Sequence, residues 1–376
     1  MKLYKSSILF ISLTFKAFCF FNGSKDYRDL FENKKILITG GTGFIGKALI
    51  SEIIKYNPDK IVIFSRDEVK HAKLLEDFNN NEKIVSILGD IRNYESIWLA
   101  SKNIDLVIHA AALKRIDILE YNIFESIYTN LIGTMNIAKA CIDNKVKTAL
   151  LISTDKACSP VNTYGACKFI SEKIFTNTSF PNETRFLVVR YGNVLQSTGS
   201  VIPFFCEKIK NKQAVLLTSC EMTRFFITKK QAVEHIFKTL KYGCGGEIFV
   251  PQIPSFKIID LIYVLQKKLG QETEIQIIGI RPGEKIHEVM INNLEVPRTY
   301  KFNGMYVILS TIKQHLEETA YTKYGQLLNI TNFNKYSSRD SIISFEDFYF
   351  FLEKNNILSE KMLNKKKNLR MSDFLI

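Results

Sequence analysis

Five residues in one stretch of this sequence could carry out hydride and proton transfer. Thr154, Asp155 and Lys156 follow a short apolar run that is typical of a buried parallel strand, so we expect them at its carboxyl end. Ligands bind at that end of the strands in open α/β sheets. Tyr164 and Lys168 follow, four residues apart, and they share one face if this segment is a helix.

The Tyr164 and Lys168 pair predicts a proton acceptor. A positive charge beside a phenol favours the phenolate, so we expect Lys168 to lower the pKa of Tyr164. Tyr164 could then accept a proton near neutral pH. The hydroxyl of Thr154, the carboxyl of Asp155 and the amine of Lys156 join this pair, so the pattern indicates a redox site with added acid–base groups.

A glycine-rich turn further upstream predicts the site of a dinucleotide. Gly40, Gly43 and Gly46 lie between an apolar strand and a helical pattern, which is the context that this motif requires. The glycines allow a tight turn, close approach to a pyrophosphate and helix–strand packing, and the helix amino terminus offers N–H groups to the anion. Neighbouring residues that we expect in the same site are Thr42, Phe44 and Ile45.

The end of the second strand predicts which dinucleotide is bound. An acid there binds the ribose 2′-hydroxyl of NAD, whereas an arginine accommodates the 2′-phosphate of NADP. Ser65 and Arg66 occupy the tip and Asp67 comes later, so we favour NADP, with NAD as the alternative if Arg66 is merely solvated. Further residues that we expect near the cofactor are Lys70, Asp90, Ile91, Ala110 and Lys114.

Three polar residues near the ends of later strands have expected roles of their own. Asp90 would accept a hydrogen bond from the adenine ring. Lys114 would face either a cofactor phosphate or the substrate. Asn130 lies where a long helical pattern begins, and we favour a structural role for it over a place in a proton path.

The alternation of strands and helices predicts an α/β fold with a doubly wound parallel sheet of the Rossmann type. From about residue 199 the pattern changes to short segments with turn signals, which indicates a smaller α/β lobe. This lobe would supply Arg224 and Arg281 to a cleft, where arginine suits a diphosphate. We divide the chain into an apolar extension (1–30), an NADP-binding domain (31–200, with a strand returning near 246–251), a mostly substrate-binding lobe (201–350) and a basic tail (351–376).

Composition narrows the class of ligand. The formal net charge is +13, but the lysines are spread along the chain and no nucleic-acid-binding motif accompanies them. We therefore expect an anionic small molecule as the ligand and no nucleic-acid partner. Seven scattered cysteines without a CxxC pair, and five separated histidines, predict no metal site and reduced thiols in the cytoplasm.

The amino terminus leaves three interpretations open. A basic start precedes a largely apolar stretch, 8–21, that Lys16 interrupts. This stretch is too short to span a bilayer comfortably. It could be a targeting or membrane-surface segment, the result of a start site assigned too far upstream, or a packed helix. Membrane contact is therefore expected, if at all, only through this segment.

The motifs, taken together, resemble the extended short-chain dehydrogenase/reductase family and, within it, the UDP-N-acetylglucosamine 4,6-dehydratases. The resemblance is to the C5-inverting branch that opens pseudaminic acid synthesis, and Tyr336-Ser337-Ser338-Arg339 also fits that branch. The motifs cover about residues 34–350 in family order: TGGTGFIGK, FSRDE, GDIRN, HAAALKRID, TNLIGTMN, STDKA, YGACK, RYGNV, GSVIPFF, MTRFFIT, GGEIFVP and GIRPGEKIHE.

The resemblance implies a role for each of the five chemical residues. Thr154 would hold the 4-hydroxyl of the sugar, and Tyr164 would take its proton while hydride leaves C4 for NADP. Lys168 would bind the nicotinamide ribose. Lys156 would remove the C5 proton, and Asp155 would protonate the departing C6 hydroxyl. Hydride would return to C6, and a proton would return to the opposite face of C5.

The resemblance also implies how UDP-N-acetylglucosamine is held and in what assembly. Asn193, Val194, Arg281 and Arg224 would hold the UDP part, and the residues also expected near the substrate are Lys114, Lys156 and Tyr164. The product would be UDP-2-acetamido-2,6-dideoxy-β-L-arabino-hex-4-ulose. The family pattern further implies a homo-oligomer.

Two features depart from the family pattern, namely Cys167 and the amino-terminal extension, which the soluble family pattern lacks. Cys167 replaces the usual threonine or serine, a change that we expect to affect packing only. Retaining, membrane-bound relatives generally carry methionine in place of Tyr164, so the tyrosine favours inversion of C5. A retaining 4,6-dehydratase or a 4-epimerase is the alternative enzyme, and a non-catalytic NADP-binding protein is the more distant one.

Overall fold

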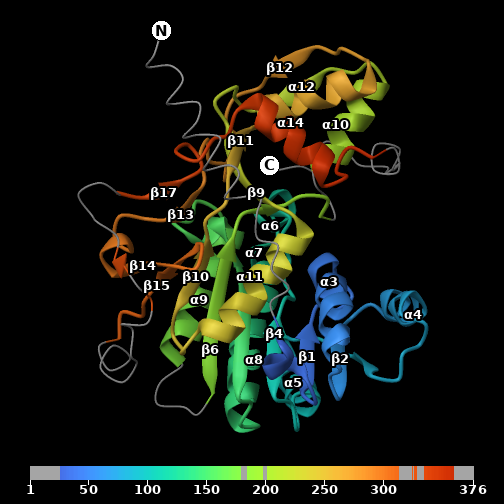
Figure 1. The fold of residues 1–376 in the computed structure, drawn as a ribbon, viewed down its shortest axis with the longest axis vertical. Helices are drawn as coiled ribbons and strands as arrows, with labels where there is room; N and C mark the ends of the chain where they lie inside the picture. Colours follow the sequence, from blue (N-terminus) through green and yellow to red (C-terminus); the bar gives the residue numbers. More distant parts are fainter. Residues whose placement is uncertain are drawn as a thin grey trace.

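A ten-stranded sheet forms the centre of the computed structural model, which describes residues 26–178, 184–197, 201–312, 324, 326–327 and 334–359. Figure 1 shows this sheet and its helices in the lower part of the molecule and a smaller lobe above it. The buried apolar runs of the sequence form its parallel strands, which are β1 (Lys35–Thr39), β2 (Lys60–Ser65), β3 (Ile84–Leu88), β4 (Leu106–His109), β5 (Thr148–Thr154), β6 (Arg185–Tyr191) and β10 (Ile248–Pro251).

The strand order confirms the doubly wound Rossmann prediction. The parallel strands lie in the order β3-β2-β1-β4-β5-β6-β10. The chain adds β2 and β3 on one side of β1 and then adds β4, β5 and β6 on the other side, so the strand order reverses between β1 and β4. Ligands of open α/β sheets bind at this switch point, beyond the carboxyl ends of the strands. The glycine-rich turn after β1 and the residues after β4 and β5 therefore meet at one edge of the sheet.

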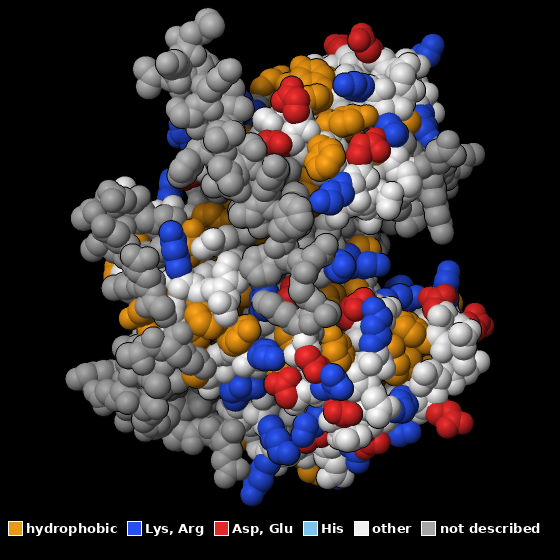
Figure 2. Space-filling model, in the orientation of Figure 1, with side chains coloured by type: hydrophobic (Ala, Val, Ile, Leu, Met, Phe, Trp, Pro, Cys, Tyr) orange, Lys and Arg blue, Asp and Glu red, His pale blue; other side chains and the backbone are white. Residues whose placement is uncertain are grey.

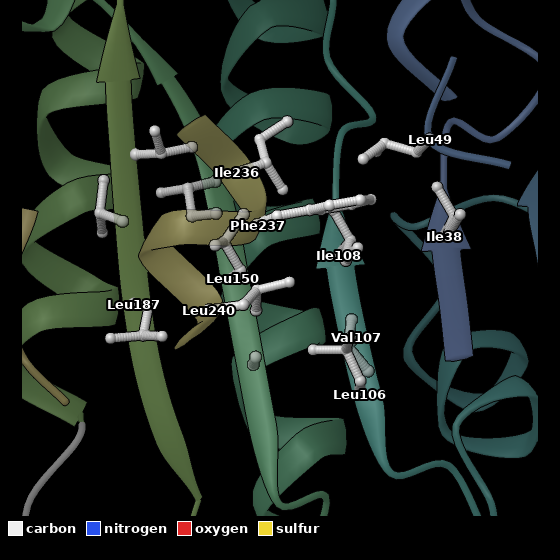
Figure 3. Close-up of a cluster of buried hydrophobic side chains, with 14 of the residues drawn as sticks. Ile38, Leu49, Leu106, Val107, Ile108, Leu150, Leu187, Ile236, Phe237 and Leu240 are labelled. Carbon is white, nitrogen blue, oxygen red and sulfur yellow. The ribbon is translucent and has the colours of Figure 1, made fainter. Parts of the chain in front are cut away.

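Helices cover both faces of this sheet. On one face, α11 (Lys229–Tyr242) places Ile236, Phe237 and Leu240 against the strands, and Leu49 of α3 (Phe44–Ile53) lies beside them (Figure 3). The helices between the other strands are α4 (Glu68–Asp77), α5 (Tyr94–Ala100), α6 (Ile116–Leu119), α7 (Ile123–Ser126), α8 (Gly133–Asp143) and α9 (Thr163–Thr178). The single turns η1 (Ile54–Tyr56), the π-helical η2 (Ile127–Ile132) and η3 (Asp155–Ala157) complete this half.

The last residues of the expected amino-terminal extension belong to the folded domain. Tyr27 lies just before α2 (Arg28–Phe31), and Phe31 is the last residue of this helix. Both rings are buried against Phe237 of α11. The predicted boundary at residue 30 is therefore wrong, because these aromatic rings complete the apolar core beside α11. Residues 1–25 lie outside the described part, in which no helix is long and apolar enough to cross a membrane.

The expected substrate lobe is divided between the main sheet and a separate core. Strands β14 (Thr299–Phe302), β15 (Met305–Ile308) and β16 (Gln326–Leu327) extend the main sheet antiparallel beyond the returning strand β10. The separate lobe packs α10 (Val201–Lys210), α12 (Ile258–Leu269) and α14 (Phe345–Lys354) around its own apolar core. The boundary expected at residue 350 is wrong, because Phe351 and Leu352 of α14 are buried in that core.

Three small sheets accompany the main sheet in the described part of the chain. The three-stranded sheet is β11-β9-β7, and the two-stranded sheets are β12-β8 and β13-β17. Their strands, with one further turn, are β7 (Asn193–Val194), β8 (Val215–Leu217), β9 (Thr223–Ile227), β11 (Ser255–Lys257), β12 (Ile275–Ile277), β13 (Val289–Ile291), η4 (Val296–Arg298) and β17 (Tyr336–Ser337). In the space-filling view the molecule is indented between the lobe and the lower domain, and Lys and Arg side chains lie on both edges of the indentation (Figure 2).

Candidate active site

The carboxyl end of β5 places Thr154, Asp155 and Lys156 where the sequence predicted them. Thr154 is the last residue of the strand and caps the short turn η3, where its Oγ1 accepts from the backbone N–H of Lys156 at 3.4 Å. The same hydroxyl donates to Asp155 Oδ1 at 3.0 Å. Asp155 is completely buried, so a carboxyl from the turn points inward instead of into solvent.

Lys156 lies between two buried carboxylates. Its Nζ is 3.2 Å from Asp155 Oδ1 and 3.4 Å from Glu288 Oε1, just before β13. Burial lowers the pKa of a lysine, but these two carboxylates outweigh burial and raise the pKa of Lys156 above its usual value. In the protein without substrate or cofactor, Lys156 is therefore an ammonium group.

Two further cations surround Glu288. Lys285 Nζ lies 3.8 Å from Glu288 Oε2, and Arg224 Nε lies 3.9 Å from Glu288 Oε1. Burial raises the pKa of a carboxyl, but Lys156, Arg224 and Lys285 outweigh it and lower the pKa of Glu288. We call Asp155, Lys156, Glu288, Arg224 and Lys285 the proton-transfer cluster.

The pKa of Asp155 shifts in the opposite direction to the pKa of Glu288. Burial raises the pKa of Asp155 more than the neighbouring Lys156 ammonium lowers it. Asp155 Oδ2 has no hydrogen-bond partner among the described residues. A carboxyl with a raised pKa takes up a proton more readily than an ordinary carboxyl and can then donate it, which suits a general acid.

Tyr164 lies beside these groups, but its pKa moves against our prediction. Burial raises the pKa of Tyr164 to about 12, and Lys156 is the cation that opposes this rise. The Lys168 Nζ instead donates to the backbone carbonyl of Ile152 at 2.7 Å. Burial lowers the pKa of Lys168 to about 8. Desolvation of the phenol therefore outweighs the expected effect of Lys168 in the protein alone.

The glycine-rich turn after β1 fits a dinucleotide phosphate. Gly40 has a φ of +68°, and a Cβ at this position would lie 2.9 Å from the backbone of Ala111. A Cβ on Gly46 would lie 2.4 Å from the Gly41 carbonyl oxygen. Gly43 is the N-cap of α3 and supplies no side-chain cap, which leaves the first N–H groups of the helix for an anion.

The turn after β2 places an exposed guanidinium beside a carboxylate that caps a helix. Asp67 caps α4 by accepting from the Lys70 backbone N–H at 3.0 Å, and its carboxylate also pairs with Lys70 Nζ. Arg66 is exposed and lies 3.5 Å from Asp90 Oδ2. The carboxylate nearest to the strand tip is therefore engaged by a helix cap, whereas the guanidinium faces outward. The other residues around this turn are Ser65 and Thr42, whose hydroxyls are 2.9 Å apart, and Ile91, which is buried.

Asn130 has the structural role that the sequence favoured. Its side-chain amide donates to the Leu113 carbonyl at 2.9 Å and accepts from the Leu113 N–H at 2.8 Å. This pair of hydrogen bonds fixes the loop after β4, which carries Ala110 and the exposed Lys114. Asn130 lies within η2, so a π-helical turn aims its side chain at the loop.

The residues expected to hold UDP are only partly brought together. Asn193 and Val194 form β7, directly beyond β6, and pair with β9. Arg281 lies in the turn that Asn162 fixes by donating to the Gly283 carbonyl at 2.8 Å. Arg224 is completely buried and donates to the Thr223 carbonyl at 2.8 Å. Its guanidinium faces Glu288 in the interior, and the expected contact of Arg224 with UDP stays a prediction.

A second buried ionic group lies beside the site, and the sequence analysis missed it. Arg190 donates two hydrogen bonds to Glu172, at 2.9 and 2.6 Å, and two to Glu295, at 3.0 and 2.9 Å. It also donates to the Met290 carbonyl at 2.7 Å. We call Arg190, Glu172 and Glu295 the anchoring cluster, because it ties β6 and α9 to the segment that carries Glu288.

Glu288 is a second site residue whose role was not predicted from the sequence. It ends the motif GIRPGEKIHE, and its position as an acid directly before a short apolar strand is the local feature that could have indicated a role. Nothing in the local spacing indicates that this carboxylate meets Lys156, because the two residues are far apart along the chain.

The fold and the site define an extended short-chain dehydrogenase/reductase. The chain matches the family model described as "Polysaccharide biosynthesis protein" over residues 36–310. It therefore belongs to this family of polysaccharide biosynthesis proteins.

Three known proteins show what the chain is similar to. It is 43% identical over 298 residues to a UDP-N-acetylglucosamine 4,6-dehydratase (inverting) of Campylobacter jejuni, which covers 78% of this chain and 88% of that protein. It is 38% identical to a UDP-glucose 4-epimerase of Rickettsia prowazekii, over 74% of this chain and 84% of that protein. The solved structure of Pen from Bacillus thuringiensis is 35% identical, with a TM-score of 0.80 over 87% of this chain and 99% of that chain.

Proposed function

We propose that this chain is a C5-inverting UDP-N-acetylglucosamine 4,6-dehydratase. One observation carries the proposal: a buried carboxyl and a buried amine, Asp155 and Lys156, lie side by side at the end of β5 next to Tyr164. Oxidation at C4 needs only the hydroxyl groups of Thr154 and Tyr164 with a cofactor. Removal of water needs one further base and one further acid. The similarity to the Campylobacter dehydratase supports the same conclusion.

The protons of the reaction can be assigned to side chains at the end of β5. Tyr164 accepts the proton of the 4-hydroxyl, which Thr154 holds in place. The glycine-rich turn would hold a nicotinamide dinucleotide, which would supply the redox chemistry by taking up hydride from C4 and returning it to C6. Lys156 takes the proton from C5, and Asp155 gives a proton to the C6 hydroxyl, which leaves as water.

One internal proton transfer prepares the elimination. Lys156 of the protein alone is an ammonium, whereas the reaction needs a neutral amine. Its proton can pass to Asp155, whose Oδ1 is 3.2 Å from Nζ. This single transfer produces both the free base and the protonated acid without changing the net charge of the pair. The raised pKa of Asp155 favours this transfer, and the raised pKa of Lys156 opposes it.

The product in deuterated water tests the reaction. Proton NMR should show a 4-keto-6-deoxy sugar with one deuterium at C5 and inverted configuration there. A product with C5 retained would indicate a retaining dehydratase. Absence of any 4-keto-6-deoxy product would overturn the proposal.

A 4-epimerase is the second candidate, because the Rickettsia relatives carry that name. An epimerase would use Thr154 and Tyr164 but would have no need of Asp155 and Lys156 as an acid and a base. It would yield the C4 epimer without deuterium at C5. The same NMR experiment therefore separates the two candidates.

NADP is the cofactor that the residues after β2 favour. An outward-facing guanidinium at Arg66 suits a 2′-phosphate, and Asp67 is engaged as a helix cap. Arg66→Ala should weaken NADP binding by about tenfold or more and leave NAD binding unchanged, because hydrogen bonds to charged groups contribute about 1.5–3 kcal/mol. Calorimetric titration with each dinucleotide tests this, and equal losses for both would contradict it.

The assembly is proposed to be a homo-oligomer. An apolar surface on α6, α7, η2 and α9 exposes 90% of Tyr121 and 75% of Phe124. Large exposed apolar surfaces mark interaction sites on soluble domains. Replacing both residues by aspartate should reduce the mass measured by analytical ultracentrifugation, and a wild-type protein that sediments as a monomer would contradict the assembly.

A further inference from the structure

Of the two carboxylates in the proton-transfer cluster, Glu288 comes from the distant carboxyl-terminal part of the chain. Its carboxylate is 96% buried and lies 3.4 Å from Lys156 Nζ. Burying an ionised carboxylate is costly unless partners compensate. Glu288 has such partners in Lys156, Arg224 and Lys285, yet its Oε2 has no hydrogen-bond partner among the described residues.

Two hydrogen bonds to Ser338 fix the backbone of Glu288. Its N–H donates to Ser338 Oγ at 2.9 Å, and its carbonyl accepts from the Ser338 N–H at 2.8 Å. Two residues further on, the Met290 carbonyl accepts from Arg190 of the anchoring cluster at 2.7 Å. The carboxylate is therefore held at a set distance from Lys156 by contacts that do not involve Lys156.

Every element packed against Lys156 contributes a charged or titratable group. Asp155 comes from η3 itself, Tyr164 from α9, Arg224 from β9 and Glu288 from the start of β13. Lys285 faces Glu288 from the preceding turn, where its Nζ also donates to the Cys158 carbonyl. Asp155 and Glu288 are the two anions of this set.

Resting on the proposed dehydratase function, we propose that Glu288 is a positioning residue for proton transfer. It holds the Lys156 amine against Asp155 and, together with Asp155, decides whether Lys156 carries a proton. Asp155 exchanges a proton with Lys156 during the reaction, whereas Glu288 stays ionised. Glu288 therefore keeps the Lys156 proton in the cluster between turnovers and sets the pH at which the free amine forms.

The pH dependence of Glu288→Gln tests the proposal. Removing an opposite charge at this distance changes a pKa by about one to three units. The acidic limb of kcat for dehydration should therefore move to lower pH by that amount, because without the Glu288 charge the pair of Asp155 and Lys156 binds a second proton less tightly. The matched control is Glu295→Gln, which removes a buried carboxylate from the anchoring cluster and should leave the limb in place.

Two further variants keep the test decisive. Glu288→Asp retains the charge, so its acidic limb should stay near that of the wild type while kcat falls. Lys285→Gln removes a cation near Glu288, so its limb should move to higher pH. A folded Glu288→Gln protein whose limb does not move would overturn the proposal. Should that variant not fold, an unmoved limb in Lys285→Gln would overturn it.

A readout without substrate separates this proposal from the proposed function. Trace acylation of lysines across a pH series, read by mass spectrometry, gives the pKa of Lys156 in the protein alone. This pKa should fall in Glu288→Gln and not in Glu295→Gln. If the wild type fails to dehydrate the sugar nucleotide but the Lys156 pKa responds as stated, the reaction assignment fails and the role of Glu288 in setting this proton stands. If the pKa does not respond, the role of Glu288 fails.

Discussion

The proton-transfer cluster and the anchoring cluster contain the same kinds of side chain at similar depth, yet their hydrogen bonding differs. Arg190 makes five hydrogen bonds, and the carboxylate oxygens of Glu172 and Glu295 all accept at least one. In the proton-transfer cluster, Asp155 Oδ2 and Glu288 Oε2 have no hydrogen-bond partner among the described residues.

This difference separates a structural ionic group from a chemical one. A buried group whose hydrogen bonds are complete gains nothing from a ligand, and losing one member leaves the others uncompensated. A group with open acceptors and opposed pKa shifts can exchange protons and meet a substrate. The two clusters share one segment, because Glu288 belongs to the first, Glu295 belongs to the second, and the Met290 carbonyl between them accepts from Arg190.

The largest effect is expected when the proton-transfer cluster loses its base. Lys156→Ala should reduce dehydration by about 10³–10⁴-fold, at the upper end of the contribution of a general base, while slow oxidation at C4 persists. Product NMR follows dehydration, and absorbance of the reduced nicotinamide in a single turnover follows C4 oxidation. Lys147→Ala, an exposed lysine just before the same strand, should behave as the wild type. Full dehydration by Lys156→Ala would contradict the role of this lysine.

The second largest effect is expected on stability, when the anchoring cluster loses its cation. Arg190→Met leaves Glu172 and Glu295 buried without their cation, so the free energy of unfolding should fall by about 3–5 kcal/mol. Urea denaturation measures this loss. Lys268→Met, which removes a surface ion pair with Glu353, should leave the midpoint almost unchanged. Equal effects of the two substitutions would show that the anchoring cluster contributes no more than a surface pair.

Acid should weaken the anchoring cluster in a defined pH range. Burial raises the pKa of a carboxyl, but Arg190 outweighs burial and lowers the pKa of Glu295 to about 2, from an ordinary 4.5. A carboxyl with a lowered pKa in the folded protein stabilises it fully above 4.5, and this stabilisation is lost as the pH falls towards 2. By pH 3 the loss should reach about 2 kcal/mol. Urea midpoints across this range measure it, and Glu295→Gln should lack this part of the slope.

The smallest effect is expected from one neutral partner of the anchoring cluster. Ser153 Oγ donates to Glu172 Oε1 at 2.6 Å, and Ser153→Ala removes that hydrogen bond while Arg190 remains paired. The free energy of unfolding should fall by about 1.5 kcal/mol, the lower end for a hydrogen bond to a charged group, because Arg190 still pairs with Glu172. The acidic limb of kcat should not move. A shifted limb would show that the two clusters are electrostatically coupled.

Much of the nucleotide half could be predicted from the sequence, because its signals are contiguous in the chain. The turn that contains Gly40 and Gly46 directly joins a strand to a helix, and Arg66 follows a strand end. Thr154 and Asp155 likewise follow a strand end. The domain boundaries were harder to predict, because strands β14 and β15 and the core of α14 depend on pairing with distant segments.

The sequence by itself determined the buried parallel strands, the glycine-rich turn and the acid–amine pair after β5, since each depends on residues that are neighbours in the chain. Only the tertiary structure decided that Lys156 is an ammonium between Asp155 and Glu288, that burial raises the pKa of Tyr164, and that Arg224 faces inward. The physical reason is that desolvation and ion pairing depend on which distant residues share a low-dielectric interior, and distance along the chain carries no information about that.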